Sequence, residues 1–179
     1  MISLRALCLG LSVAAFAACG SESAPRPKPQ SPFASGGVAF VYTAVDGSEL
    51  SSATTRGRAT AVLFLTTYDL ASQLMARRLD GVVRRHVPRT NAAAVVLEPP
   101  KYVVMAQSFG SALNLSYPVA MADEWKDRHT PFGRIDRVPT VIILDRSGAE
   151  TTRFIGVVSE AELESALTAA SKRGFSLSR

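Results

Sequence analysis

From Gly37 onward, the sequence alternates between short, continuous apolar runs and longer amphipathic segments. Three runs have the length and the bounded apolar character of strands buried on both faces; they cover residues 60–66, 92–97 and 138–144. Two segments that separate these runs, 70–87 and 101–113, repeat apolar residues at helical spacing. Strands separated by helices form parallel sheets, so this alternation predicts one α/β domain.

The remaining segments predict further strands, turns and helices. The expected strands cover 39–45, 117–121 and 152–157, the expected hairpin turns lie at 46–47 and 145–148, and a short helix is expected within 124–134. Ser159 is expected to cap a final helix, because Glu162 stands where a capping box requires it. The turn at 145–148 places an antiparallel strand beside the parallel ones, so we expect a mixed sheet.

The apolar faces of the three long helices follow from the same spacing. We expect the first to bury Ala71, Leu74, Met75, Leu79, Val82 and Val83. We expect the second to align Tyr102, Val103, Ala106, Phe109 and Leu113, and the last to align Ala161, Leu163, Ala166, Leu167 and Ala170.

Residues 1–18 have the character of an export signal. Their one charged side chain is Arg5, and the apolar run that follows is too short for a bilayer core, which takes about 20 residues. Two cleavage sites fit. Ala15-Phe16-Ala17 suits a general signal peptidase, whereas Phe16-Ala17-Ala18-Cys19 resembles the bacterial lipobox, in which the cysteine is lipidated. The lipobox is favoured, because an exposed, unpaired thiol is prone to oxidation in an oxidising compartment.

Residues 19–36 then predict an extended, hydrated tether, because prolines alternate with polar residues. At about 3.1 Å per residue it spans up to roughly 50 Å. We therefore expect an exported lipoprotein of the cell envelope, anchored in a membrane through Cys19. Gly20 follows the cysteine where an Asp would retain enteric lipoproteins in the inner membrane, so the outer membrane is favoured. Export makes nucleic acid an unexpected partner.

The order of four later segments resembles the thioredoxin-like superfamily, specifically the membrane-tethered TlpA/ResA-type disulfide reductases and the related peroxiredoxins. These segments are Tyr-Pro-Val at 117–119, Phe-Gly-Arg-Ile-Asp-Arg-Val-Pro-Thr at 132–140, Ile-Leu-Asp-Arg-Ser-Gly at 143–148 and Phe-Ile-Gly at 154–156. The resemblance implies a thioredoxin-like three-layer α/β/α sandwich with a mixed central sheet over residues 37–179. It also implies a cis-proline at Pro139, between Val138 and Thr140, beside the active site.

The sequence departs from this superfamily at its reactive motif. Relatives read roughly Ala-Thr-Trp-Cys-x-x-Cys, whereas residues 66–72 read Thr-Thr-Tyr-Asp-Leu-Ala-Ser. Asp69 therefore stands at the position of the nucleophilic cysteine, Ser72 at that of the resolving one, and Tyr68 precedes them. Disulfide exchange needs a thiolate and a second thiol, and the two cysteines of the chain, Cys8 and Cys19, lie in the N-terminal segments. We expect no catalytic residue and no enzymatic activity.

The substituted residues suit structural roles. Asp69 is expected to cap the helix that follows, and Ser72 to face solvent or its own backbone. We expect a binding or scaffold module for an envelope protein or peptide, with a shallow groove at Pro139, Tyr68 and possibly Trp125, although ordinary packing is favoured for Trp125. The alternative is a component of envelope thiol-disulfide or peroxide handling that borrows thiols from a partner.

Neither a metal nor another cofactor is expected. His86 and His129 are far apart in the sequence and have no nearby cysteine, so we expect both on the surface. Four arginines form a basic stripe on the first long helix: Arg77, Arg78, Arg84 and Arg85. We expect a solvated helix face, with attraction to anionic lipid as the alternative.

Overall fold

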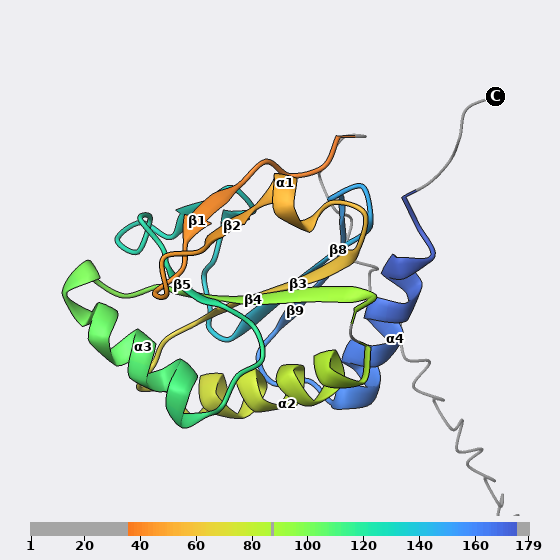
Figure 1. Cartoon of the computed structure of the whole chain (residues 1–179). Coiled ribbons are helices and arrows are strands. Elements are labelled where there is room, and N and C mark those ends of the chain that lie inside the picture. Colours follow the sequence, from red (N-terminus) through yellow and green to blue (C-terminus); the bar gives the residue numbers. More distant parts are fainter. Residues whose placement is uncertain (1–35, 87, 175–179) are drawn as a thin grey trace, which may run out of the picture.

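The structure is a computed structural model that describes residues 36–86 and 88–174 (Figure 1). The strands in this part are β1 (Val41–Thr43), β2 (Glu49–Ser51), β3 (Ala59–Leu65), β4 (Thr90–Val96), β5 (Val119–Met121), β6 (His129–Thr130), β7 (Gly133–Arg134), β8 (Thr140–Leu144) and β9 (Glu150–Ile155). The helices are α1 (Ser52–Thr55), α2 (Leu70–His86), the 3₁₀ helix η1 (Pro100–Tyr102), α3 (Val103–Ala112) and α4 (Glu160–Ser171).

A mixed sheet with the strand order β5-β4-β3-β8-β9 forms the centre of the fold. β3 pairs in parallel with β4, and β4 with β5, whereas β8 is antiparallel to both β3 and β9. Every residue of β3 is buried, as expected for a central strand covered on both faces. The predicted α/β domain with a mixed sheet is confirmed.

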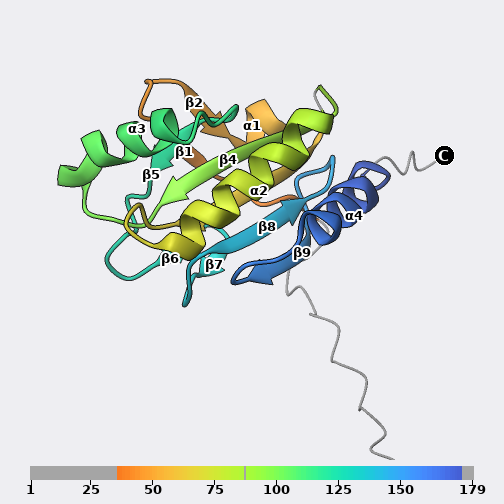
Figure 2. The ribbon, with the colours of Figure 1, turned by 90° about the horizontal axis from the view of Figure 1, so that it is seen from below.

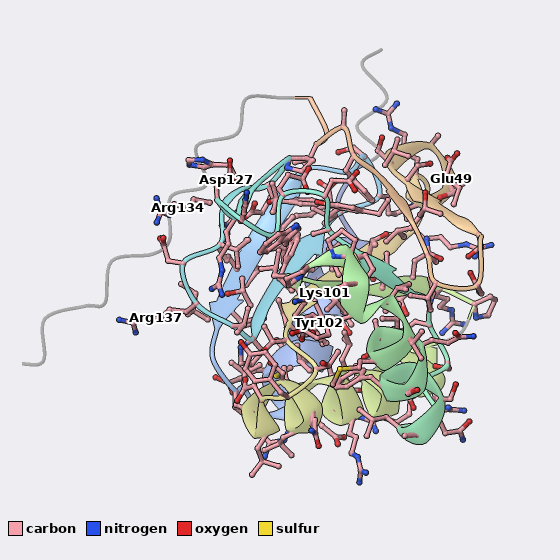
Figure 3. All side chains as sticks on the ribbon, turned by 90° about the vertical axis from the view of Figure 1, so that its left-hand side faces the viewer. Glu49, Lys101, Tyr102, Asp127, Arg134 and Arg137 are labelled. Atoms are coloured by element: carbon pink, nitrogen blue, oxygen red, sulfur yellow. The ribbon has the colours of Figure 1, made fainter. Side chains whose placement is uncertain are left out.

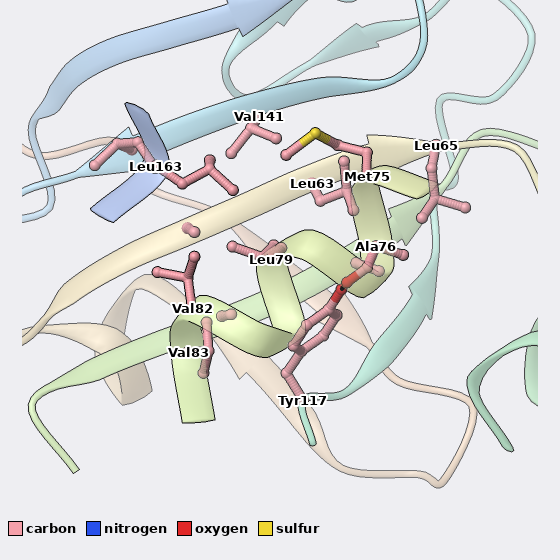
Figure 4. Close-up of a cluster of buried hydrophobic side chains, with 14 of the residues drawn as sticks. Leu63, Leu65, Met75, Ala76, Leu79, Val82, Val83, Tyr117, Val141 and Leu163 are labelled. Atoms are coloured by element: carbon pink, nitrogen blue, oxygen red, sulfur yellow. Dashed lines mark hydrogen bonds between the residues drawn. The ribbon is translucent and has the colours of Figure 1, made fainter. Parts of the chain in front are cut away.

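The two faces of the sheet are covered differently. α2, α3 and α4 lie on one face, and the β1–β2 hairpin, α1 and the segment with β6 and β7 lie on the other (Figures 1 and 2). Successive β3 side chains point into two cores: Leu63 packs with Met75 and Leu163 on the helical side (Figure 4), and Phe64 packs with Phe132 on the other. Both cores draw their residues from Val38 to Ala170, so the chain without residues 1–19 keeps this entire core.

Residues 124–134 do not form the expected helix. After a series of turns, Arg128 adopts positive φ just before the short hairpin β6–β7, and Gly133 adopts it within the hairpin. Phe132 is fully buried, with its ring centroid 5.1 Å from that of Phe40 and 5.7 Å from that of Phe64. The expectation is wrong because positive φ interrupts a helix, and because burial of Phe132 dictates the path of this segment.

The expected helix faces are partly wrong. Leu74 is 41% exposed, whereas Ala76 and Ser72 are fully buried in its place. Val103 is exposed at the start of α3, and Tyr102 is exposed because it belongs to η1, whose three-residue turn does not continue the face of α3. Ala161 is exposed at the start of α4.

The capping box of α4 is confirmed. The Glu162 backbone N–H donates to Ser159 Oγ at 3.3 Å, and the Ser159 backbone N–H donates to Glu162 Oε2 at 2.9 Å. The Ser159 hydroxyl also donates to Glu162 Oε2 at 2.7 Å, and this bond, followed by the one from the Ser159 backbone N–H, holds the pKa of Glu162 below its usual range.

The predicted signal peptide, Cys19 and the tether up to residue 35 lie outside the described residues. None of the helices in the described part combines the length and the apolar character of a membrane span.

Candidate functional site

The candidate site lies where β3 ends and α2 begins. Residues 66–69 join the two elements at the carboxyl end of the central strand, which is the usual place for ligand sites in sheets of this kind. Thr66 and Thr67 are buried in this loop, whereas the Tyr68 side chain is 73% exposed.

Asp69 caps α2. Its carboxylate accepts bonds from the Ala71 backbone N–H at 3.1 Å, from the Ser72 backbone N–H at 3.1 Å, and from the Ser72 hydroxyl at 2.8 Å. The carboxylate also lies at the positive end of the helix dipole. The N-cap interpretation of Asp69 is confirmed.

Ser72 is fully buried, so of its two expected positions, facing solvent or facing the backbone, the solvent-facing one is wrong. Its side chain points back beneath the loop, where its Oγ accepts a bond from the Thr66 backbone N–H at 3.4 Å while donating to Asp69. The position three residues after an N-cap lies directly over the loop that enters the helix, which explains the burial.

Replacing Asp69 by alanine should lower the free energy of unfolding by about 1–2 kcal/mol, because two backbone N–H groups and the buried Ser72 hydroxyl would lose their acceptor. Urea unfolding of residues 20–179 measures this loss. Asp69→Asn is the matched control, since its amide oxygen also caps helices, and it should cost less. Equal stability of Asp69→Ala and the unmodified chain would contradict the capping role.

A buried carboxylate, Glu98, holds the loop from the other side. Only 4% of this residue is exposed, and its two oxygens accept bonds from the Thr67 backbone N–H and, at 3.1 Å, from the Thr67 hydroxyl. Glu98 was not predicted as a site residue. The available signal was its place directly after a buried strand, because a carboxylate is rarely buried without a partner.

The proline loop meets the same end of the sheet. The register pairs Phe64 with Thr140, which places Pro139 beside the end of β3. The Val138–Pro139 peptide bond is cis, and the Pro139 carbonyl accepts a bond from the Gly156 backbone N–H at 2.7 Å. The fold thus brings Val138, Pro139 and Thr140 to the edge that carries Tyr68, Asp69 and Ser72.

An apolar groove opens beside Thr67, between α2 and α3. Its volume is about 320 Å³, and its lining residues are Thr67, Gln73, Val104, Met105, Ser108, Phe109, Ala112 and Leu113. Large apolar side chains stay exposed near it, Leu70 at 77% and Val104 at 67%. Sequence analysis placed a groove at Tyr68, Pro139 and Trp125 and did not predict this one, because it depends on how two helices pack.

Trp125 is half-buried in the turns before β6, and Lys126 Nζ lies 6.0 Å from the centroid of its ring. Figure 3 views the end of the molecule at which β3 finishes, with Lys101, Tyr102 and Arg137 labelled. Lys101 Nζ lies 5.1 Å from the centroid of the Tyr102 ring there.

The histidines lie apart. His86 is partly exposed at the surface, where its Nε2 lies 3.3 Å from Glu164 Oε1. His129 is exposed in β6. Within residues 36–86 and 88–174, no three metal-ligating side chains gather into a group.

Most of the arginine stripe on α2 is engaged with neighbouring elements. Arg84 pairs with Asp80 on α2 itself and donates to the Asn114 carbonyl at 2.6 Å, Arg85 bridges Glu160 and Glu164 on α4, and Arg78 donates to the Val158 carbonyl. Partial burial alone would raise the pKa of Asp80. The hydrogen bonds from Arg84 and Ser116 outweigh this effect and hold that pKa below its usual range. The stripe is solvated as expected at Arg77, Arg84 and Arg85, but Arg78, Arg84 and Arg85 also bond to other parts of the chain.

Comparison with known proteins identifies the fold. No protein-family model and no curated protein sequence matches the chain. Among solved structures, a thioredoxin-family thiol:disulfide interchange protein from Chlorobium tepidum superposes with a TM-score of 0.62 at 22% identity, covering 75% of this chain and 94% of its own. A secreted disulfide oxidoreductase from Mycobacterium tuberculosis gives 0.60 at 20% identity, covering 74% and 96%. A DsbF homologue from Corynebacterium diphtheriae gives 0.67 at 15%, covering 75% and 85%. The chain has the thioredoxin-like fold.

Proposed function

We propose that this thioredoxin-like domain binds an envelope protein or peptide at the groove between α2 and α3, and performs no redox chemistry of its own. In this proposal the chain is an exported lipoprotein, lipidated at Cys19 and held at the cell envelope by the tether of residues 19–36. The observation that carries the proposal is the pairing of Asp69 with Ser72 at the start of α2, beside an open apolar groove.

The chemistry of this pair opposes disulfide exchange. A thiolate must attack sulfur, and a second thiol must then release the mixed disulfide. Asp69 and Ser72 instead bind each other and the first backbone N–H groups of α2, so the positive end of the helix is already occupied by a fixed carboxylate. The described residues contain no cysteine.

The surface around this pair suits binding. The exposed side chains of Tyr68 and Leu70 lie at the start of α2, and Val104 and Met105 lie on α3 at the groove. Clustered apolar side chains on a soluble domain mark interaction sites, and a groove of about 320 Å³ accommodates one or two apolar side chains of a partner.

A second candidate function is supported by the solved structures of similar fold, which are described as thiol:disulfide interchange proteins. Together with the cis-proline loop, this likeness favours a component of envelope thiol-disulfide or peroxide handling that acts with the thiols of a partner. Tyr68 and Pro139 would then contact the partner while the partner supplies both sulfurs.

Photo-cross-linking in intact cells tests the binding proposal. A photoreactive amino acid at Val104 should yield a discrete adduct, because this side chain is exposed beside the groove. Val41 is the matched control, since it is 66% exposed but lies on the β1–β2 hairpin of the opposite face. Leu70→Asp should remove the adduct at Val104, because a charge would be brought against the apolar surface. Equal labelling at both positions, or an adduct that persists with Leu70→Asp, would contradict the groove.

A further inference from the structure

The end of the sheet opposite the candidate site carries a row of arginines. The parallel register pairs Ala59 with Thr90, so Arg58 and Arg89 lie side by side just outside β3 and β4. The antiparallel register pairs Thr60 with Leu144, which brings Arg146 to the same end, just outside β8. Three arginines that are far apart in the sequence thus lie across three neighbouring strands.

Further cations lie near this row, because other segments contact the turn at Arg146. The Gly57 backbone N–H donates to the Arg146 carbonyl at 2.9 Å, and Arg146 Nε donates to the Gly57 carbonyl at 3.1 Å, which places Arg56 nearby. The backbone of Gly174 packs against Arg146, which brings in Lys172 and Arg173 at the end of α4. We call this surface the basic end; its residues are Arg56, Arg58, Arg89, Arg146, Lys172 and Arg173.

Five cations of the basic end are exposed to solvent. Arg56, Arg58, Arg89, Lys172 and Arg173 take part in none of the ion pairs found among residues 36–86 and 88–174. The acidic side chains near this end already have partners. Asp145 is buried and accepts bonds from Ser147 and Ala149, and Glu164 pairs with Arg85 and His86 at the end of α2.

The described chain also begins at the basic end. Gly37 packs against the turn at Ser147 and Gly148, and the Val38 backbone N–H donates to the Gly148 carbonyl at 2.9 Å. In Figure 1, the start of the described chain, the end of α4 and the loop before β3 lie on the right, whereas the loop after β3 lies on the left. A tether from Cys19 would therefore reach the domain at the basic end.

We propose that the basic end docks on the anionic phospholipid surface of a membrane. An anionic membrane is the partner because its charge complements that of the basic end, and because residues 19–35 join the domain there. Docking in the cell rests on the proposed lipid anchor at Cys19. Each cation near such a surface strengthens binding about fivefold. Because β3 has seven residues, docking in this way holds the candidate site about 20 Å from the surface, facing away from it.

Vesicle sedimentation with residues 20–179 tests docking without any lipid anchor. The domain should bind vesicles made of equal parts phosphatidylglycerol and phosphatidylcholine, and should not bind phosphatidylcholine alone. Arg56→Gln with Arg58→Gln should weaken binding about 25-fold. Lys101→Gln with Arg137→Gln removes the same charge from the opposite end and should leave binding unchanged. Raising NaCl from about 0.1 to about 0.5 M should release the protein.

The orientation of the docked domain on the vesicle is measured separately. Residues 20–179 contain no cysteine, so a single introduced cysteine can carry a fluorophore at a chosen position. A fluorophore attached through Ala169→Cys, in the last turn of α4, should be quenched by quenchers placed in the lipid headgroups. The same fluorophore attached through Leu70→Cys, at the start of α2, should not be quenched. Circular dichroism and thermal unfolding check that each variant is folded.

Three results would overturn the proposal: equal loss of binding with both double variants, equal quenching at both labels, or binding to duplex DNA but not to anionic vesicles. Failure of membrane docking can be distinguished from failure of the proposed function. Mass spectrometry that finds Cys19 unmodified in the membrane fraction would refute the lipid anchor alone, and a Val104 cross-link that persists with Leu70→Asp would refute the groove alone.

Discussion

Replacing Asp69 and Ser72 together by cysteine should turn a domain without insulin-reducing activity into one that reduces insulin with dithiothreitol as the electron donor. The two side chains already approach within 2.8 Å of each other, at the start of a 17-residue helix and beside the Pro139 loop. A thiol at such a helix start has its pKa lowered toward about 7, which gives about 15-fold more thiolate at neutral pH than an ordinary cysteine.

Insulin turbidity with residues 20–179 measures this gain, with the unmodified domain expected to match a buffer blank. The single substitutions D69C and S72C are the controls. Each has one thiol and should stall or stay silent, because a second thiol must release the mixed disulfide. Turnover by the unmodified domain would contradict its proposed lack of redox chemistry. A folded but inactive D69C/S72C variant would show that more than the two thiols has been lost from the site.

Replacing Phe132 by alanine should lower the free energy of unfolding by about 3–5 kcal/mol and Tm by about 10 °C. Phe132 is fully buried, and its ring packs between those of Phe40 and Phe64. Removing the ring leaves a cavity between β3 and the segment that covers it, and the surrounding side chains fill such a cavity only in part.

Chemical denaturation and thermal melts of residues 20–179 measure this effect. Phe154→Ala is the matched control, because Phe154 is only partly buried on β9 and should cost less. Phe132→Leu should retain most of the stability, since it keeps much of the buried apolar volume. Equal losses for Phe132→Ala and Phe154→Ala would show that residues 122–138 do not depend on the aromatic cluster.

The strand arrangement could be predicted largely from local patterns. The run that became β3 is short, apolar and bounded, so burial on both faces followed directly. The start of α4 followed from Ser159 and Glu162, whose bonds need no other part of the chain. The capping role of Asp69 was predictable for the same reason.

Other features of the candidate site were not predictable, because they depend on contacts between distant segments. Ser72 is buried by the loop that bends over it, and the carboxylate of Glu98 is held by Thr67, which lies 31 positions earlier. The groove exists because α3 packs beside α2 at a particular distance. Spacing within one helix contains no information about that distance.

The sequence by itself determined the fold class, the positions of the main strands and the lack of a thiol pair at residues 69 and 72, because periodicity and residue chemistry are local properties. Only the tertiary structure decided which surfaces those residues form. Strand register aligns Arg58, Arg89 and Arg146 at one end of the sheet and places Pro139 near Asp69 at the other. Register relates residues of different strands, and it is set by which side chains the packed domain buries, so it cannot be derived from one segment alone.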